Sequence, residues 1–369
     1  MQPVAGRGVA WITLVTACLV LASAQAFGAE DIATVVGKVN QAQYTTYQVK
    51  VQNMGLDLPD QGYRSRDELG GGDPLDGDQG NPGNRETQVY LANQFTGMGL
   101  NVSVQGTFRN VVAELPGAKT PDTIYIVCAH YDTYDNTFNH GVRPGGDDNA
   151  SGTAGVLEAA RVLSQYQFNS TIRFIAFNGE EGWMWGSHDY VDNVVWPNHQ
   201  NIAGVINLDM ILRPGWDSQP SHVKDLNIET QNTPSCTALA GKFVAAAAAY
   251  APALPIDPVV SHANSNAGDQ GPFLAKGFTA IDLLENTVDD IWNQGSNAYY
   301  HTSDDASDGM ANNPNNGTGI TYDYAFATDV VRATVGTLAG EAVLTTPEPA
   351  TMALLAAGGV GMLLRRRRK

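Results

Sequence analysis

Positive charge is scarce in this sequence. Its 369 residues include 21 Lys and Arg against 38 Asp and Glu, which gives a formal net charge of −17 at pH 7. A protein that binds nucleic acid needs a basic surface to meet the phosphate backbone, so this balance excludes that class of partner. The acidity is typical of a soluble secreted protein, and carboxylates clustered around metal ions would add to it.

Cysteine is also scarce, with only Cys18, Cys128 and Cys236 present. Cys18 stands in an apolar leader, so two cysteines remain for the mature chain. A disulfide between Cys128 and Cys236 is possible, but their spacing alone does not establish it. Because Cys128 lies in the apolar run 123–129, a buried free thiol is the favoured interpretation.

Neither an internal repeat nor a second domain boundary is evident between residues 27 and 346. Glycine, in contrast, is abundant at 39 residues, and 43% of the chain is hydrophobic. This composition allows a sizeable core and is typical of a loop-rich enzyme rather than a helical bundle. We therefore predict a single domain over residues 27–346.

The N-terminus has the pattern of a secretory signal peptide over residues 1–26. Arg7 supplies the positive start, residues 9–22 are largely apolar, and Ala24-Gln25-Ala26 is a small-residue cleavage site. We expect signal peptidase to process it. An uncleaved membrane anchor and a lipoprotein-type leader at Cys18 are the alternatives.

The C-terminus, residues 347–369, has three parts. Pro347-Glu348-Pro349 is followed by a largely apolar segment, 350–364, and then by four arginines and a lysine. The segment is shorter than the roughly 20 residues of a full membrane span, and its basic end would stay cytoplasmic. A plain C-terminal anchor is one interpretation.

This three-part tail resembles the PEP-CTERM sorting signal of Gram-negative bacteria. The resemblance implies an exosortase-like processing enzyme that cuts at the motif, after transient membrane association through the apolar segment. The protein would then be exported to the cell surface, to the periplasm or to the medium.

Strand-like and helix-like runs alternate along the middle of the chain. Short apolar runs rich in β-forming residues lie at 111–115, 123–129, 171–177 and 203–208. Helical patterns lie at 31–52, 86–98, 154–166, 186–194, 234–250, 269–276 and 322–343. This alternation predicts an α/β fold, a three-layer α/β/α sandwich with a mixed, mostly parallel central sheet.

Polar side chains follow these strands, where open α/β sheets collect catalytic groups. His130 and Asp132 come directly after the second strand, and alternation puts both on one side. A zinc-bound imidazole needs a partner for its second N–H, which Asp132 could supply. Asp147 and Asp148 lie in the glycine-rich turn 145–152, where adjacent acids are costly unless a cation or a helix N-terminus neutralises them.

Three further groups continue the pattern. Glu180 and Glu181 follow the third strand, and paired carboxylates can divide labour between metal ligand and base. Asp209 terminates the fourth strand, and His301 lies in a late loop. Alone, each group has a structural explanation: a helix cap for Asp148, or a solvated acidic loop for the glutamates.

In this order the groups resemble the co-catalytic zinc aminopeptidase family, which includes aminopeptidase Y and bacterial leucyl and secreted aminopeptidases. The resemblance covers residues 31–344 and implies a zinc-exopeptidase-like fold with two Zn²⁺ ions. Asp148 would bridge the two ions. His130 and Asp209 would complete one site. Glu181 and His301 would complete the other.

The same resemblance makes Glu180 the general base for hydrolysis of peptide substrates. Asp132 would orient His130, and Asp305 could support His301. Two histidines and three carboxylates suit zinc with positions open for water, although cobalt or manganese could occupy such ligands.

The sequence departs from the family pattern near this pair of glutamates. Trp183 stands where the family usually has glycine, and Met184 where it has leucine. These changes leave the ligands intact and the substrate preference open. In the stretch 268–273, Gly268 and Gln270 replace a serine and a histidine of the family, and we expect a packing or pocket role there.

Three functions remain as hypotheses. The favoured one is an exopeptidase, an aminopeptidase rather than a carboxypeptidase or dipeptidase. The second is a catalytically idle surface or interaction domain on the same fold. The third is an acyl transferase of the glutaminyl-cyclase type, which uses one zinc, so counting metals per chain would separate it from the first.

Overall fold

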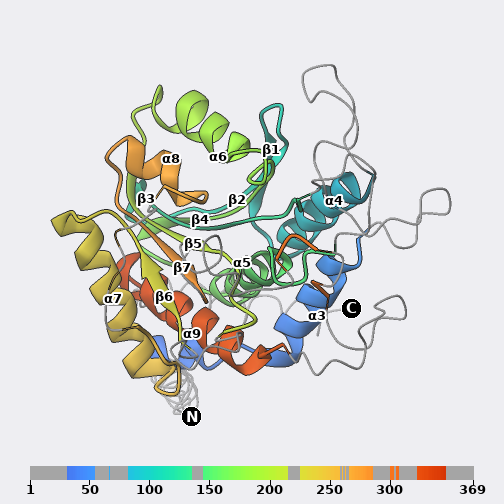
Figure 1. The fold of residues 1–369 in the computed structure, drawn as a ribbon. Coiled ribbons are helices and arrows are strands. Elements are labelled where there is room, and N and C mark those ends of the chain that lie inside the picture. Colours follow the sequence, from blue (N-terminus) through green and yellow to red (C-terminus); the bar gives the residue numbers. More distant parts are fainter. Residues whose placement is uncertain are drawn as a thin grey trace, which may run out of the picture. The chain divides into compact units, whose positions relative to one another are not determined.

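A seven-stranded sheet forms the centre of the structure, in the order β1-β2-β4-β3-β5-β7-β6 (Figure 1). Its strands are β1 (Asn101–Gln105), β2 (Asn110–Leu115), β3 (Thr120–His130), β4 (Ser170–Phe177), β5 (Asn201–Leu208), β6 (Asn227–Glu229) and β7 (Ala280–Leu284). The four neighbours β4, β3, β5 and β7 are parallel, whereas β2 and β6 run antiparallel to the strands beside them. The predicted α/β fold with a mixed sheet is confirmed.

This computed structural model describes part of the chain. The described residues are 31–54, 66, 82–134, 144–214, 225–257, 260, 262, 266–285, 300–302, 305–306 and 322–345. The fold is that of Ile32–Leu344. The predicted signal peptide and sorting segment lie outside the described residues.

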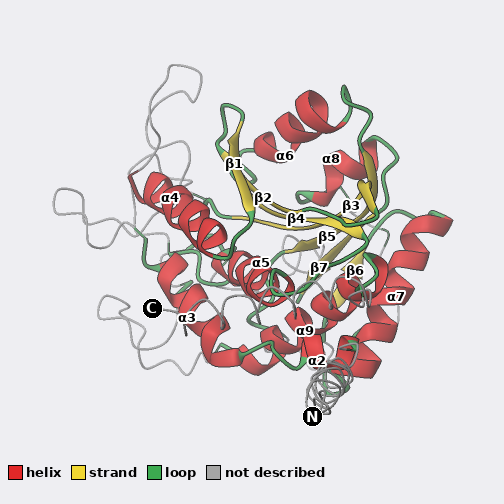
Figure 2. Ribbon diagram, turned by 180° about the vertical axis from the view of Figure 1, so that it is seen from behind, coloured by secondary structure: helices red, strands yellow, loops and turns green. Residues whose placement is uncertain are grey.

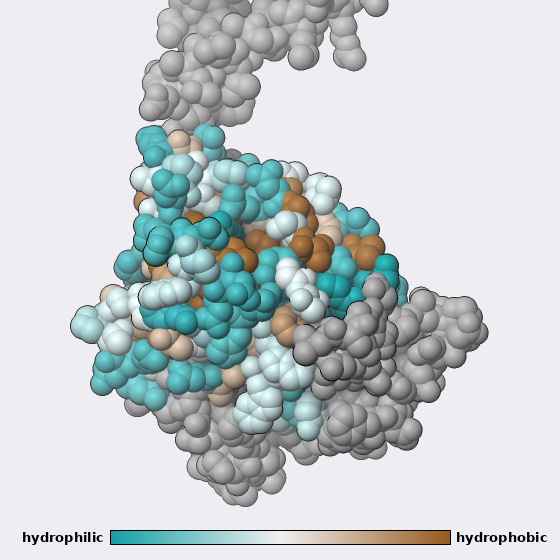
Figure 3. Space-filling view, turned by 90° about the horizontal axis from the view of Figure 1, so that it is seen from above, coloured by the Kyte–Doolittle hydropathy of each residue, from teal (hydrophilic) through white to brown (hydrophobic). Residues whose placement is uncertain are grey.

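Helices cover both faces of the sheet (Figure 2). One face carries α2 (Ile32–Val36), α3 (Gln41–Gln52), α4 (Pro82–Gly97), α5 (Ala150–Leu163), α7 (Pro234–Tyr250) and α9 (Tyr324–Glu341). The other carries α6 (Trp185–Tyr190), the π-helical turn η1 (Val191–Val195) and α8 (Gln270–Ala275). Seen from above α6 and α8, apolar side chains form separate patches among polar ones (Figure 3).

Alternate strand residues contribute to two separate cores. Val127 and Ala129 of β3 belong to the core shared with α5 and α9, while Ile126 and Cys128 belong to the core that includes Phe273 of α8. Because both faces of the parallel strands are buried, their sequences read as continuous apolar runs. Cys128 and Cys236 are both buried and free, which confirms the thiol interpretation.

Three strands were not predicted from the sequence. β1 has the largely exposed sequence NVSVQ at the edge of the sheet, and β6 is only three residues long. The five residues of β7 are all buried but are interrupted by Asp282. Each is too short or too polar to give a clear periodic signal.

No helix within the described ranges is long and apolar enough to cross a membrane. The apolar segment 350–364 lies outside the described residues, so its membrane association stays a prediction.

Candidate metal centre

The predicted ligands meet at the carboxyl ends of the parallel strands. His130 is the last residue of β3, Asp209 follows β5, and the pair Glu180–Glu181 lies three residues beyond β4. β3 and β4 end in register, with His130 opposite Phe177. The parallel strands therefore bring residues far apart in the sequence to one edge of the sheet.

Asp148 lies in the turn that leads into α5. Asn149 caps that helix, because its side chain accepts the N–H of Gly152 at 2.8 Å. The same side chain donates to the carbonyl of Leu208 at 2.9 Å, one residue before Asp209. One asparagine thus fixes the Asp148 turn against the end of β5.

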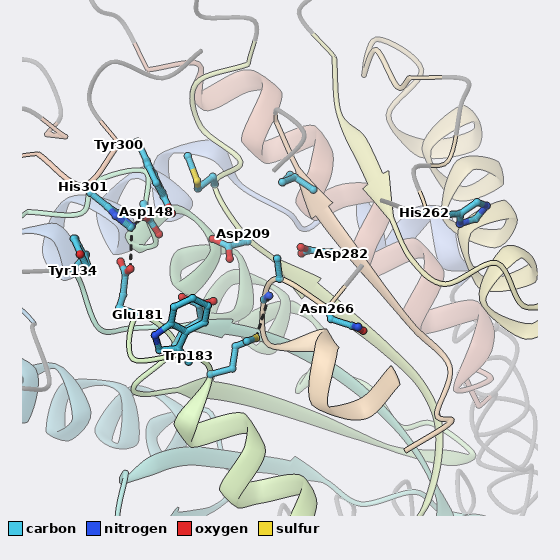
Figure 4. A pocket seen from close by; sticks show the side chains of 16 residues that line it. Tyr134, Asp148, Glu181, Trp183, Asp209, His262, Asn266, Asp282, Tyr300 and His301 are labelled. Carbon is cyan, nitrogen blue, oxygen red and sulfur yellow. Dashed lines mark hydrogen bonds and ion pairs between the residues drawn. The ribbon is translucent and has the colours of Figure 1, made fainter. Parts of the chain in front are cut away.

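The two carboxylate oxygens of Asp148 face different imidazoles. Oδ1 lies 3.1 Å from Nε2 of His130, and Oδ2 lies 3.1 Å from Nε2 of His301. Asp209 stands on the His130 side, with its Oδ1 3.5 Å from Nε2. Glu181 stands on the His301 side, with its Oε2 2.9 Å from Nε2 (Figure 4). The structure thus brings the five predicted ligands together in two groups joined by Asp148.

Glu180 lies at the edge of this cluster, with its Oε2 4.0 Å from Nε2 of His130. Asp132 holds this region together. Its Oδ1 lies 3.4 Å from Nδ1 of His130, and its carboxylate accepts the N–H groups of Glu180 at 3.3 Å and Glu181 at 3.2 Å. Asp132 therefore lies beside the imidazole that it was predicted to orient, and it fixes the loop that carries both glutamates.

Asp305 supports the site in a way that differs from the prediction. The described hydrogen bonds of its carboxylate come from the N–H groups of Asp147 and Asp148, at 3.0 Å each, and from the Tyr322 hydroxyl at 2.7 Å. It thus fixes the main chain of the Asp148 turn to the loop that follows His301, rather than the imidazole itself.

Both histidines have raised pKa values in the metal-free chain. Burial alone would lower the pKa of His130, but the carboxylates of Asp209, Asp132 and Asp148 outweigh it and raise that pKa well above its usual range. For His301, Glu181 and Asp148 likewise outweigh burial and raise the pKa to about 11. In both cases the surrounding carboxylates favour a positive charge at the imidazole.

The carboxylates respond to burial and to these imidazoles. Burial raises the pKa of Glu180 well above its usual range and that of Glu181 to about 7. Burial also raises the pKa of Asp209. For Asp148, contact with His130 and His301 outweighs burial and holds its pKa well below the usual range. So many acids in one buried place are costly without a compensating cation.

The donor set fits zinc. The ligand atoms of His130, Asp148 and Glu181 lie within 4.8 Å of one another. Asp209 Oδ1 and Glu181 Oε1 are buried and have no hydrogen-bond partner among the described residues. Imidazole nitrogens with carboxylate oxygens are the ligands of catalytic zinc sites, and buried oxygens left unpaired are available to coordinate a cation.

A cavity of about 870 Å³ opens over these ligands. Tyr134, His301 and Tyr300 lie at one end, and Asp282, Asn266 and His262 lie towards the other (Figure 4). Its apolar lining consists of Met184, Met210, Ala267, Leu284 and the exposed ring of Trp183.

Strained backbone is concentrated around this cavity. Positive φ angles, from 54° to 76°, occur at Trp183, Met184, Met210 and His301. Residues other than glycine rarely adopt such angles. Residues held in this way cost about 1–3 kcal/mol each and cluster at functional sites. Trp183 is in addition 76% exposed, which is unusual for so large an apolar side chain.

Sequence reasoning missed two residues that shape the site. Asp147 was recognised as an acid in the turn, but its role was not: its Oδ1 accepts the N–H of Leu212 at 3.0 Å, just beyond Asp209. Arg66 was not recognised at all. It stands two residues after Arg64, and no local pattern distinguishes it.

Comparison with known proteins places the chain in a family. The sequence profile of peptidase family M28 matches residues 110–319, more than half of the chain. The chain belongs to peptidase family M28. A second profile, the PEP-CTERM protein-sorting motif, matches residues 345–368 of this M28 peptidase.

Curated relatives agree with this family. A probable zinc metalloprotease of Pyrenophora tritici-repentis is 29% identical over 203 residues, 48% of this chain and 46% of the relative. Aminopeptidase YwaD of Bacillus subtilis is 41% identical over 93 residues, 25% of this chain and 19% of that one. The M28 peptidase thus spans less than half the length of these relatives. The matching family is one of peptidases, and the relative from Pyrenophora tritici-repentis is named as a probable zinc metalloprotease.

Solved structures share the fold. The LapA aminopeptidase of Legionella pneumophila matches with a TM-score of 0.61 at 16% identity, covering 86% of this chain and 76% of that one. The glutaminyl cyclase of Porphyromonas gingivalis also matches at 0.61, with 18% identity, covering 82% and 99%. At these identities the likeness shows the fold of the M28 peptidase and nothing finer.

Proposed function

We propose that this M28 peptidase is an exported aminopeptidase that binds two zinc ions. Asp148 would be a ligand shared by both ions. His130 and Asp209 would complete one site, and His301 and Glu181 would complete the other. The observation that carries this proposal is the division of the Asp148 carboxylate, whose two oxygens each lie 3.1 Å from a different imidazole nitrogen. A structural acid that only capped α5 would not need a histidine on each side.

Glu180 is the general base. When bound, zinc supplies Lewis acidity to the scissile carbonyl and to the attacking water. The Glu180 carboxylate accepts a proton from that water and delivers it to the leaving amine. Its position supports this role, because Glu180 lines the cavity beside the ligands while Asp132 fixes its main chain at 3.3 Å.

A free amino terminus is the favoured recognition element. Carboxylates are among the residues that line the cavity, and they would attract the ammonium group of a peptide but not the blocked terminus of an N-acylated one. The relatives named as aminopeptidases support this choice. The sorting motif at 345–368 supports export and surface sorting in a Gram-negative bacterium, with processing by an exosortase-like enzyme. The leader pattern at residues 1–26 supports processing by signal peptidase.

The test is hydrolysis of aminoacyl-nitroanilides alongside the same substrates with an acetylated amino group. We expect cleavage of the free-amine series only, and its loss on chelation of zinc. A Glu180→Gln preparation, purified in parallel, controls for contaminating host peptidases. Cleavage of the acetylated series alone would contradict the aminopeptidase assignment.

A second candidate is a glutaminyl cyclase, favoured by a match that covers 99% of the cyclase from Porphyromonas gingivalis. The aminopeptidase and the cyclase can be distinguished by their reaction products and by the number of zinc ions bound per chain. Cyclisation of an N-terminal glutamine without cleavage of any nitroanilide, together with one zinc per chain, would support the cyclase.

A further inference from the structure

Arg66 is a fully buried arginine next to the metal centre. Its guanidinium makes four described hydrogen bonds, all to main-chain carbonyl oxygens. Nε donates to Tyr131 at 2.7 Å, Nη1 donates to Val51 at 3.3 Å and to Pro144, and Nη2 donates to Gly145 at 3.0 Å. Such a fork of fixed donors can join several chain segments at once.

The carbonyls that Arg66 binds belong to the segments that carry ligands. Tyr131 stands between His130 and Asp132, so one bond fixes the end of β3. Pro144 and Gly145 lead into the turn that carries Asp148, so two further bonds fix that turn. The guanidinium therefore sets the distance between the two chain segments whose side chains meet at 3.1 Å.

The main chain of Arg66 extends the connection to a third segment. Its carbonyl accepts the side-chain amide of Asn84 at 2.7 Å, and the same amide donates to Asn178 at 2.6 Å. Asn178 lies two residues before Glu180. The N–H group of Arg66 donates to the Thr133 hydroxyl at 3.0 Å, next to Asp132. Arg66 thus links the segments that hold His130, Asp148 and Glu181.

The neighbouring backbone is built to admit the guanidinium. Gly145 has a φ of +50°, and a Cβ atom there would lie 2.9 Å from Nη2 of Arg66 and 2.3 Å from the Thr133 side chain. Only glycine allows this close approach.

Packing alone does not account for a charged residue here. Burial lowers the pKa of Arg66 to about 10, opposed by Asp305, Asp132, Asp148 and Glu181, so the side chain stays charged at neutral pH. An apolar side chain of similar size would avoid the cost of burying that charge. What the guanidinium adds is a set of directed bonds and a positive charge facing four site carboxylates.

We propose that Arg66 is a positioning residue for the metal centre, which holds the His130, Asp148 and Glu180–Glu181 segments at the spacing that binds zinc. The proposal rests on the proposed zinc site but not on the aminopeptidase assignment. Two effects of the residue are separable, because its bonds bring the ligands together while its positive charge opposes the binding of a cation.

The test compares Arg66→Lys with Arg66→Met. Zinc affinity is measured by competition with a chromophoric chelator, and folding by thermal unfolding of the metal-free proteins. Lysine keeps the charge but loses the planar fork, so we expect zinc to bind about 10–100-fold more weakly in Arg66→Lys, as when other partners of metal ligands are removed. Arg66→Met should also bind zinc more weakly. Where hydrolysis is measured, kcat should fall with KM changed little.

Arg173 provides the matched control. It is also largely buried, and it bonds Glu114 at 2.8 Å and Tyr190 at 2.9 Å, away from the ligand-bearing segments. Arg173→Lys should lower the unfolding temperature without changing zinc affinity. Unchanged zinc affinity in folded Arg66→Lys, or tighter binding in Arg66→Met, overturns the proposal. Failure of both Arg66 variants to fold also overturns it, because the residue would then serve folding alone.

Discussion

The carboxylate of Asp305 accepts the main-chain N–H of Asp148 at 3.0 Å. Two residues 157 positions apart in the sequence are joined by this bond, and each belongs to a segment that carries a proposed zinc ligand. Asp148 supplies the bridging carboxylate, while His301 lies four residues before Asp305. The relative position of the two metals' ligands therefore depends on an acid that touches neither imidazole in the described structure.

The first prediction concerns this bond. Asp305→Asn keeps the size of the side chain but turns an amide NH₂ towards N–H donors, so at least one hydrogen bond to the turn is lost. We expect zinc affinity to fall by about 10–100-fold. Tyr322→Phe is the control, because it removes only the hydroxyl that donates to Asp305 at 2.7 Å. An equal loss in both variants, measured by chelator competition, would show that the bond to Asp148 has no special role.

The second prediction concerns Glu180. Glu180→Gln removes the proton acceptor without removing a proposed ligand, so turnover should fall by about 100-fold or more while zinc content stays that of the wild type. Metal analysis and nitroanilide hydrolysis on one preparation measure both. Loss of zinc instead would mean that the roles of Glu180 and Glu181 are reversed.

The third prediction concerns pH. Burial raises the pKa of Glu181, Asp147 and Asp269 to about 7, whereas an unfolded carboxyl titrates near about 4. Between these values the folded metal-free chain binds more protons than the unfolded chain, so its stability falls as pH rises. His301, with a pKa of about 11, adds to the same trend above pH about 6.5, because its unfolded form loses the proton first.

The metal-free protein should therefore have a lower unfolding temperature at pH 8 than at pH 5. Bound zinc would balance the negative charge in place of the protons. The unfolding temperature of the zinc-loaded protein should therefore fall much less between pH 5 and pH 8. Calorimetry of both forms across this range measures the difference. If the metal-free protein is instead more stable at pH 8 than at pH 5, its stability changes with pH in the opposite direction and the prediction is contradicted.

The fourth prediction concerns Trp183, which is 76% exposed at the cavity and has a φ of +76°. Glycine adopts that conformation freely, so Trp183→Gly should raise the free energy of unfolding by about 1 kcal/mol. If the exposed ring contacts substrate, the same change should raise KM and leave zinc content unchanged. If Trp183→Gly is more stable but its KM is unchanged over a panel of substrates, the ring of Trp183 has no part in substrate binding.

His130, Glu181 and Asp209 each follow a strand with a strong local signal, whereas Asp148 and His301 were predicted as ligands from the family resemblance. The apolar runs before His130, Glu180 and Asp209 are buried on both faces, so they identify strands without knowledge of the fold. Alternation with helices then predicts that the strands are parallel and that their carboxyl ends meet.

The remaining features depend on contacts between distant residues. Arg66 bonds carbonyls as far as 79 residues along the chain, and nothing in its own neighbourhood indicates them. The same holds for Asp305, which accepts a hydrogen bond from the N–H of Asp148, 157 residues earlier in the sequence. β1 is an exposed edge strand with a polar sequence, so periodicity did not reveal it. Local patterns and the family resemblance predicted the candidate site residues, and long-range contacts determine what holds them in place.

The central claim, a two-zinc peptidase site bridged by Asp148, is tested most directly by titrating zinc into the metal-free protein while following hydrolysis of a free-amine nitroanilide. The account predicts that activity rises from near zero and reaches its plateau at two zinc ions per chain. A plateau at one ion per chain, or activity that does not depend on zinc, would contradict it.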